Sequence, residues 1–200
     1  MGSASNEDGM SGEQAAAWEI LERAAGNDDV GLVEHLDDLC ESAGFHVWEL
    51  ATENDIGGVA FEMDALMVAL LADASDVLDW LVMRCMDRVE NPGEPEAMKR
   101  LEKFTIRCLV QVGLPNGQAN INGLAASAAE TILGWMRAAS SADAFDEFRL
   151  GLESKLSPDA MAIFDQVAGR WRAKEEAAEM RAAVVAEEDS AQQGRASKAL

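Results

Sequence analysis

The longest apolar run in the chain, residues 64–85, constrains the fold more than any other stretch. Its first half, 65–72, is apolar on all sides and too short to cross a bilayer, which predicts a helix buried between neighbours. Its second half is amphipathic, and Asp76 suits the first turn of that helix. The run therefore predicts two antiparallel helices whose core residues are Leu66, Trp80 and Leu81. The apolar face of the second helix comprises Val77, Leu78, Leu81, Val82 and Cys85.

A second helical hairpin is expected before this run. After a polar leader, which we expect to be disordered over residues 1–12, an apolar stripe runs through 13–25 and breaks at residues 26–29. The next stripe continues to Cys40. Between the two hairpins, residues 43–58 hold aromatic residues and two glycine breaks. We expect a connecting loop there, with one helical turn and with Trp48 packed over the core.

The two hairpins resemble the helix pair of an ankyrin repeat, whose pattern is T-P-L-H-x-A-A, a Gly turn, and then V-V-x-x-L-L-x-x-G. Leu66, Ala69, Val77, Leu78, Leu81 and Val82 match that pattern, as do the earlier Leu21, Ala24, Ala25, Leu32, Val33 and Leu36. Asp73 and Asp28 stand at the turn Gly, and Cys85 and Cys40 stand at the closing Gly. Residues 109–116 are similar to the end of a further repeat. The resemblance implies stacked antiparallel helical hairpins over residues 19–136 and a protein-binding surface.

The match departs from the family pattern in residue type and in spacing. Asp64, Ala65 and Met67 replace the Thr, Pro and His, Asp73 replaces the turn Gly, and Cys85 replaces the closing Gly. Leu66 follows Leu21 by 45 residues, where the family repeats about every 33. Extra chain therefore separates the two copies. A generic pair of antiparallel helices rich in Ala, Leu and Val would match part of the same pattern, so this alternative stays open.

Further helices are expected after residues 91–95, whose two prolines and glycine end the apolar run. Pro95 suits the first position of a helix, and Gly113 suits a left-handed cap at its end. The basic flank of this helix should either pair with nearby acids or dock on the acidic residues 1–90. The following helices should begin at a capping box, Ser127 to Glu130, then span 141–156, and then run from Pro158 to about 186. The predicted domains are a helical-hairpin domain over 13–139, C-terminal helices packing on it over 140–186, and a disordered tail over 187–200.

Composition supports an all-α class with essentially no sheet, because Tyr is absent and nearly half of the residues are apolar, with many Ala and Leu. Three cysteines without a C-x-x-C spacing suit a reducing, cytoplasmic setting. The charge of −21 is uneven, since residues 1–90 hold 21 acidic and 3 basic side chains. Such a field disfavours nucleic acid and anionic membranes and would speed encounter with a basic protein. The acidity alternatively serves solubility only.

Residue patterns for catalysis, cofactor binding or metal binding are missing from the sequence. No nucleotide-binding loop, catalytic Ser motif or zinc spacing occurs. His35 lies beside Glu34 and one turn from Asp38, but it lacks the second His or Cys of a specific metal site. We therefore expect no enzyme and no cofactor.

The expected function is a protein–protein interaction module that binds through its hairpin surface. The alternative is an acidic inhibitor, an immunity-type or a chaperone-like protein, that neutralises a basic partner. The expected partner-binding residues are Glu34, Asp37, Asp38, Glu41 and Trp48. We expect the four acids on solvated helix flanks, where their replacement by amides leaves the fold intact.

Overall fold

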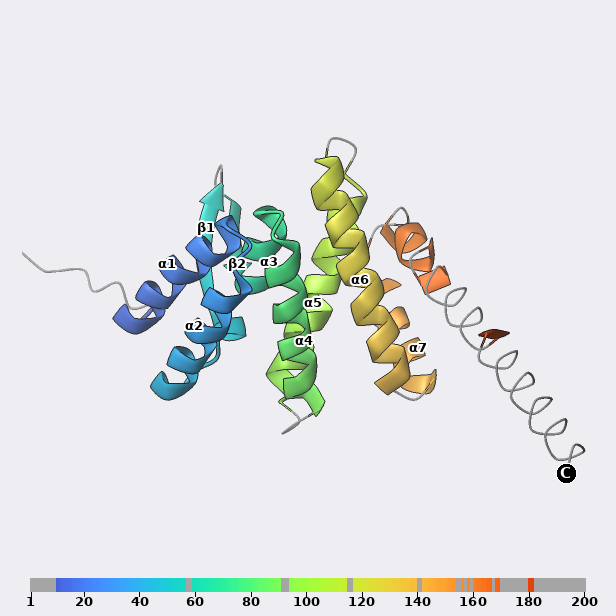
Figure 1. Cartoon of the computed structure of the whole chain (residues 1–200). Coiled ribbons are helices and arrows are strands. Elements are labelled where there is room, and N and C mark those ends of the chain that lie inside the picture. Colours follow the sequence, from blue (N-terminus) through green and yellow to red (C-terminus); the bar gives the residue numbers. More distant parts are fainter. Residues whose placement is uncertain are drawn as a thin grey trace, which may run out of the picture. The chain divides into compact units, whose positions relative to one another are not determined.

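A computed structural model describes residues 10–56, 59–90, 94–114, 117–139, 142–153, 156, 158, 160–166, 168–169 and 180–181. These residues are mostly helical, so the helical class is confirmed (Figure 1). The helices are α1 (Gly12–Gly26), α2 (Val30–Ala43), α3 (Ala65–Leu71), α4 (Ser75–Glu90), α5 (Pro95–Val112), α6 (Ala119–Ala139) and α7 (Ala142–Glu153). Between α2 and α3 lie a 3₁₀ turn, η1 (Val47–Glu49), and two strands, β1 (Ala51–Ile56) and β2 (Val59–Asp64).

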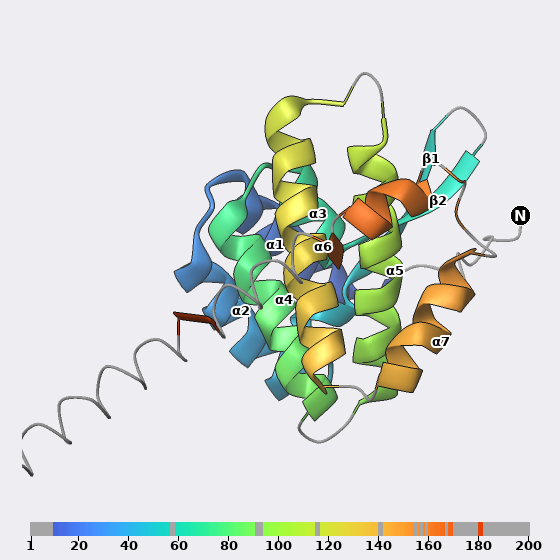
Figure 2. The same ribbon diagram turned by 90° about the vertical axis from the view of Figure 1, so that its right-hand side faces the viewer.

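The chain divides into two compact units, Met1–Ile132 and Leu133–Leu200. In the first unit α1 packs on α2, which we call the first hairpin, and α3 packs on α4, the second hairpin. The hairpins stack through contacts of α1 with α3 and of α2 with α4, and α5 packs on α4 (Figures 1 and 2). Both helix pairs are confirmed at the expected positions. No described helix combines the length and the apolar character that crossing a membrane requires.

Side-chain caps explain why the first hairpin begins and ends where it does. Ser11 and Gln14 form a reciprocal capping box at the start of α1, and the Asp29 carboxylate accepts from the Leu32 amide at the start of α2. Gly44 ends α2 with a φ of +88°, a backbone conformation that glycine adopts without a Cβ clash. Local chemistry therefore defines both helices before any packing.

The turns of the two hairpins share one unusual residue. Asp28 and Asp73 are both aspartates with positive φ, 51° and 59°, in a region that Asp tolerates better than most residues. The Asp28 carboxylate reaches across to the second hairpin and accepts from the Asp76 and Val77 amides, both at 3.0 Å. Asp73 accepts in the same way from the Asn120 side chain at the start of α6. Each turn thus contacts the beginning of a helix in the next part of the stack.

The prediction of a plain connecting loop and of essentially no sheet is wrong for residues 51–64. Here β1 and β2 form an antiparallel pair in which Ile56 faces Val59 and Ala51 faces Asp64. The expected single helical turn is confirmed as η1. Short strands that flank a Gly-Gly pair form a hairpin whose alternating pattern is too brief to stand out beside long helices.

The basic flank of α5 docks on this strand pair and also pairs with a nearby acid of its own helix through Lys99 and Glu96, so both of its predicted roles are confirmed. The Arg107 guanidinium pairs with Asp64 at 2.7 Å and donates to the Glu62 carbonyl at 2.8 Å. Lys103 and Arg100 both pair with the Glu62 side chain. These cations lower the pKa of Glu62, with the Lys103 hydrogen bond as the largest cause. The positive charge of α5 is therefore used inside the first unit.

The predicted core is confirmed at Leu66 and Leu81 but is wrong at Trp80, which is partly exposed. The three cysteines are free and buried. Burial raises the pKa of the Cys40 thiol to about 11 and raises the thiol pKa of Cys85 and Cys108 as well. These thiols are therefore core residues with little nucleophilic character.

Two predicted helix ends are wrong. Gly113 has a φ of −78° and is not left-handed, and Ser127 lies inside α6, which begins at Ala119. In the second unit α7 falls within the predicted 141–156, and Arg149 pairs with Glu153 and with Asp165. The leader was predicted over 1–12, but its end is wrong, because Ser11 caps α1 and Gly12 begins it. Residues 1–9 of the leader, the tail over 187–200 and much of the last helix lie outside the described residues.

Candidate interaction surface

Asp37 is a structural carboxylate, and the expectation that it lies on a solvated flank is wrong. It is only 3% exposed. Its Oδ2 accepts from Arg84 Nε of α4 at 2.7 Å, and its Oδ1 faces the Val47 amide of η1 at 3.4 Å. A buried carboxylate needs such partners, because transfer of an unpaired charge out of water costs several kcal/mol. Asp37 therefore ties α2 to α4 and to η1.

Glu41 belongs to the same network, one helical turn further along α2. Its Oε1 accepts from Arg84 at 2.7 Å and also pairs with Arg88. His46 lies between two carboxylates, with Nδ1 3.6 Å from Glu41 and Nε2 3.7 Å from Glu94. We call Asp37, Glu41, His46, Arg84, Arg88 and Glu94 the arginine network.

The arginine network contains the group of potential metal ligands that the described residues bring together. Asp37, Glu41 and His46 can each place one ligand atom within 4.8 Å of the others. Both carboxylates already hold arginine side chains, which a bound cation would have to displace. The charges are therefore balanced by ion pairs, and we assign no metal to this cluster. Its members also differ from the grouping around His35 that the sequence suggested.

The remaining predicted binding residues divide between surface and core. Glu34 and Asp38 are exposed on α2, as expected. Trp48 is packed in the core with 1% of its surface exposed, and its ring stacks on His46 with centroids 5.5 Å apart. Packing against the core was predicted for Trp48, but its position is not accessible to a partner. Glu34, Asp38 and Glu41 are thus the exposed members of the predicted set, and Glu41 is held by Arg84 and Arg88.

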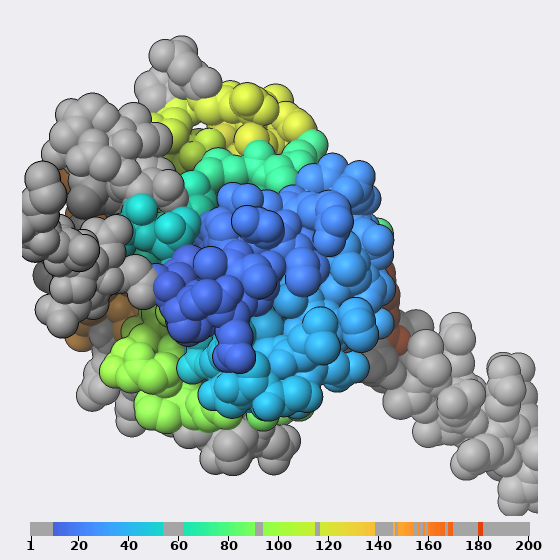
Figure 3. Space-filling view, turned by 90° about the vertical axis from the view of Figure 1, so that its left-hand side faces the viewer, coloured from blue at the N-terminus to red at the C-terminus, as the bar shows by residue number. Residues whose placement is uncertain are grey.

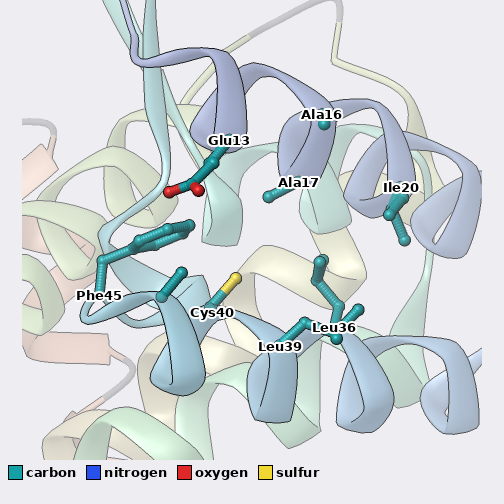
Figure 4. Close-up of a pocket in the computed structure, with 9 residues that line it drawn as sticks. Glu13, Ala16, Ala17, Ile20, Leu36, Leu39, Cys40 and Phe45 are labelled. Atoms are coloured by element: carbon teal, nitrogen blue, oxygen red, sulfur yellow. The ribbon is translucent and has the colours of Figure 1, made fainter.

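The first hairpin carries a groove that sequence reasoning missed (Figure 4). This α1–α2 groove has a volume of about 250 Å³ and is lined by Glu13, Ala16, Ala17, Ile20, Leu36, Leu39, Cys40, Ala43 and Phe45. All but Glu13 are apolar, and Leu39 is 49% exposed. Figure 3 shows that α1 and α2 lie at the surface on this side of the first unit. The first hairpin therefore presents an apolar hollow to solvent.

The sequence alone does not separate this groove from the core. Leu32, Leu36 and Leu39 follow i, i+4, i+7 spacing and share one stripe of α2. The structure buries Leu36 and places Leu39, on the same stripe, at the open edge of the groove.

The charges around the first hairpin are almost all negative. Of the three basic residues in 1–90, Arg84 and Arg88 belong to the arginine network. Among the described residues of that half, Arg23 is the basic side chain without a carboxylate partner. Exposed acids on α1 and α2 are Glu13, Glu19, Glu22, Glu34, Asp38 and Glu41. The first hairpin is thus acidic, and Glu13 is the carboxylate that lines its groove.

Comparison of the chain with protein-family models, with curated proteins and with solved structures gave no match. Its function is therefore inferred from the groove and from the distribution of charge.

Proposed function

We propose that this protein is a non-enzymatic protein–protein interaction module that binds its partner through the first hairpin. The supporting observation is the α1–α2 groove, an apolar hollow of the first hairpin in which Leu39 is half exposed. The terminal hairpin of a stack normally carries a polar outer face, because nothing packs on it. An apolar hollow at that place suits a surface that is covered in a complex.

The proposal includes an ankyrin-like arrangement of the first unit. It is supported by two stacked helix pairs whose turns hold Asp28 and Asp73 in the left-handed conformation, where the family pattern has Gly. The strand pair between the hairpins accounts for the 45-residue spacing. A generic stack of helical hairpins remains the alternative, and both arrangements present the same groove.

The second candidate is an acidic inhibitor, an immunity-type or chaperone-like protein that neutralises a basic partner. It is favoured by the acidic excess of residues 1–90, in which Arg23 is the basic side chain without a carboxylate partner among the described residues. For this candidate, binding would depend on charge steering, and the association rate would fall steeply with added salt. A complex held by the groove would lose much less of its rate.

The proposed partner is another protein, and the negative surface makes nucleic acid and anionic membranes unsuitable partners. The proposed location is the cytoplasm, where the three buried thiols stay reduced.

A photo-crosslinking amino acid at position 39 tests the interaction module. In extract of the source organism, the reagent at Leu39 should capture a defined protein, and the same reagent at Met83, which is exposed on α4, should not. The captured protein should then bind the purified chain and lose affinity on Leu39→Gln. Equal capture at both positions would contradict binding through the first hairpin.

A further inference from the structure

The α1–α2 groove has the dimensions of a docking site for side chains. At about 250 Å³ it is smaller than the cavities of roughly 300–1,000 Å³ that usually hold cofactors or small ligands. Figure 4 shows the α1 residues Ala16, Ala17 and Ile20 opposite Leu36, Leu39 and Cys40 of α2. The groove thus offers room for a few aliphatic side chains between two walls of small and branched residues.

The walls of the groove follow helical spacing. The α1 wall uses residues 13, 16, 17 and 20, and the α2 wall uses 36, 39, 40 and 43, each set being a single i, i+3, i+4, i+7 stripe. Two antiparallel stripes form a channel between two helices, and the ridge of a third helix fits such a channel. An amphipathic helix with apolar residues at the same spacing is the matching occupant.

The charge around the groove selects among such helices. Glu13 lines the groove, and Figure 4 places its carboxylate beside Phe45. Glu19 and Asp38 are exposed on the same hairpin but lie off the two wall stripes, so they act on a partner through the negative field of the hairpin. Glu13 and this field favour Lys or Arg over Glu or Asp on the flanks of a helix seated in the groove.

The same charges argue against a second copy of this chain as the occupant. Two first hairpins packed groove to groove would bring two Glu13 carboxylates into the contact and would join two acidic hairpins. Like charges at a contact cost free energy, and the chain carries −21 overall. A partner with the opposite sign avoids this cost.

We infer that the α1–α2 groove binds an amphipathic helix of a partner protein, with aliphatic residues on its buried stripe and Lys or Arg on its flanks. This inference rests on the proposed interaction module and specifies the chemistry of its partner. It also accounts for the two features that support the rival functions, because the groove supplies contact area and the negative charge of the first hairpin supplies steering.

The experiment uses three synthetic helical peptides and the full chain. The first peptide carries Leu at i, i+3, i+4 and i+7 with Lys on both flanks. The second replaces each Lys by Glu, and the third has the composition of the first with the Leu residues dispersed around the helix. Binding is measured by fluorescence anisotropy at low and at high ionic strength, and the oligomeric state of the chain alone is measured by sedimentation.

Variants locate the site. Leu39→Gln removes an exposed apolar wall residue and Ala16→Phe fills the groove, and neither changes a buried residue. Each variant should weaken the binding of the Lys-flanked peptide about tenfold, which corresponds to a loss of roughly 1.4 kcal/mol of binding free energy. Met83→Gln is the matched control, because Met83 is similarly exposed on α4. It should leave affinity within about twofold.

The outcomes separate this inference from the proposed function. The inference predicts that the Lys-flanked peptide binds, and that the Glu-flanked and dispersed peptides bind much more weakly. Equal binding of the Lys-flanked and Glu-flanked peptides would contradict a partner helix with basic flanks, and so would a dimer of the chain that Leu39→Gln dissociates. In both cases the groove would still be an interaction surface. Equal binding of the dispersed peptide, or no binding by the Lys-flanked one, would overturn the inference. The crosslink at position 39 then decides separately whether the proposed function survives.

Discussion

The first and second hairpins share a local design but occupy different environments. Both join two helices through an aspartate with positive φ. In the second hairpin, α3 is buried at Ala65, Leu66, Ala69 and Leu70 and contacts α1, β2 and η1. In the first hairpin, the α1–α2 groove leaves Leu39 half exposed. The same helix pair thus serves as a core in one place and as a surface in the other.

The largest expected difference between the hairpins is the loss of stability when one leucine in each is truncated to alanine. Leu81→Ala in α4 should lower the free energy of unfolding by about 2–5 kcal/mol, because Leu81 is fully buried and its truncation leaves a cavity. Leu39→Ala in α2 should cost less than about 1 kcal/mol. Denaturant titration followed by circular dichroism measures both values. A similar cost for the two variants would show that the first hairpin is covered in the free protein.

The next effect compares two neighbouring acids on α2. Asp37→Ala should lower the free energy of unfolding by about 1.5–3 kcal/mol, because it removes a charged hydrogen bond from Arg84 in a buried place. Asp38→Ala should stay within about 0.5 kcal/mol, because Asp38 is exposed. Thermal unfolding of both variants checks the difference. Equal stabilities would mean that the arginine network adds nothing to the contact between the hairpins.

A smaller effect tests whether the turn of the first hairpin stabilises the second. Asp28→Gly keeps the positive φ accessible but removes the carboxylate that accepts from the Asp76 and Val77 amides. The expected loss is about 0.5–2 kcal/mol, the usual cost of losing a helix cap. Hydrogen exchange should quicken at those two amides. Asp28→Asn, which keeps an acceptor oxygen, is the control, and in this variant the same two amides should exchange at close to the rate of the unmodified protein.

The smallest effect concerns Asp79 on α4. Burial, together with Asp76 and Asp28, raises the pKa of this carboxyl. The folded state then binds the proton more tightly than the unfolded state, so ionised Asp79 destabilises the fold above its raised pKa and stops doing so below the unfolded pKa. Asp79→Asn should therefore raise the melting temperature slightly at neutral pH and leave it unchanged at low pH. A gain that persists at low pH would assign the effect to something other than this charge.

Sequence patterns predicted the parts of the fold that depend on long periodic stripes and on caps. The hairpin helices and Pro95 at the start of α5 are such cases. The strand pair was missed because each strand has six residues, and Ser127 misled because a capping box inside a helix reads the same as one at its start. Neither case can be decided without knowing what packs nearby.

The candidate site was predicted only in part, for a related reason. Glu34, Asp37, Asp38 and Glu41 lie on one broad side of α2. Arg84 and Arg88, which pair with Asp37 and Glu41, follow more than 40 residues later in the chain. Composition shows an acidic excess but not which acids are neutralised. The groove needed the placement of α1 against α2, which a stripe on either helix alone does not determine.

The aspartates at the turns link the folding of successive parts of the stack. Asp28 completes the start of α4, and Asp73 contacts Asn120 at the start of α6. Asp28 therefore supplies part of the nucleation of α4 from a neighbouring turn, and contacts between neighbours are the coupling that makes a linear array behave as a cooperative unit. Order should then spread along the array from hairpin to hairpin, and deletion of the first hairpin should leave α4 to fray from its exposed end.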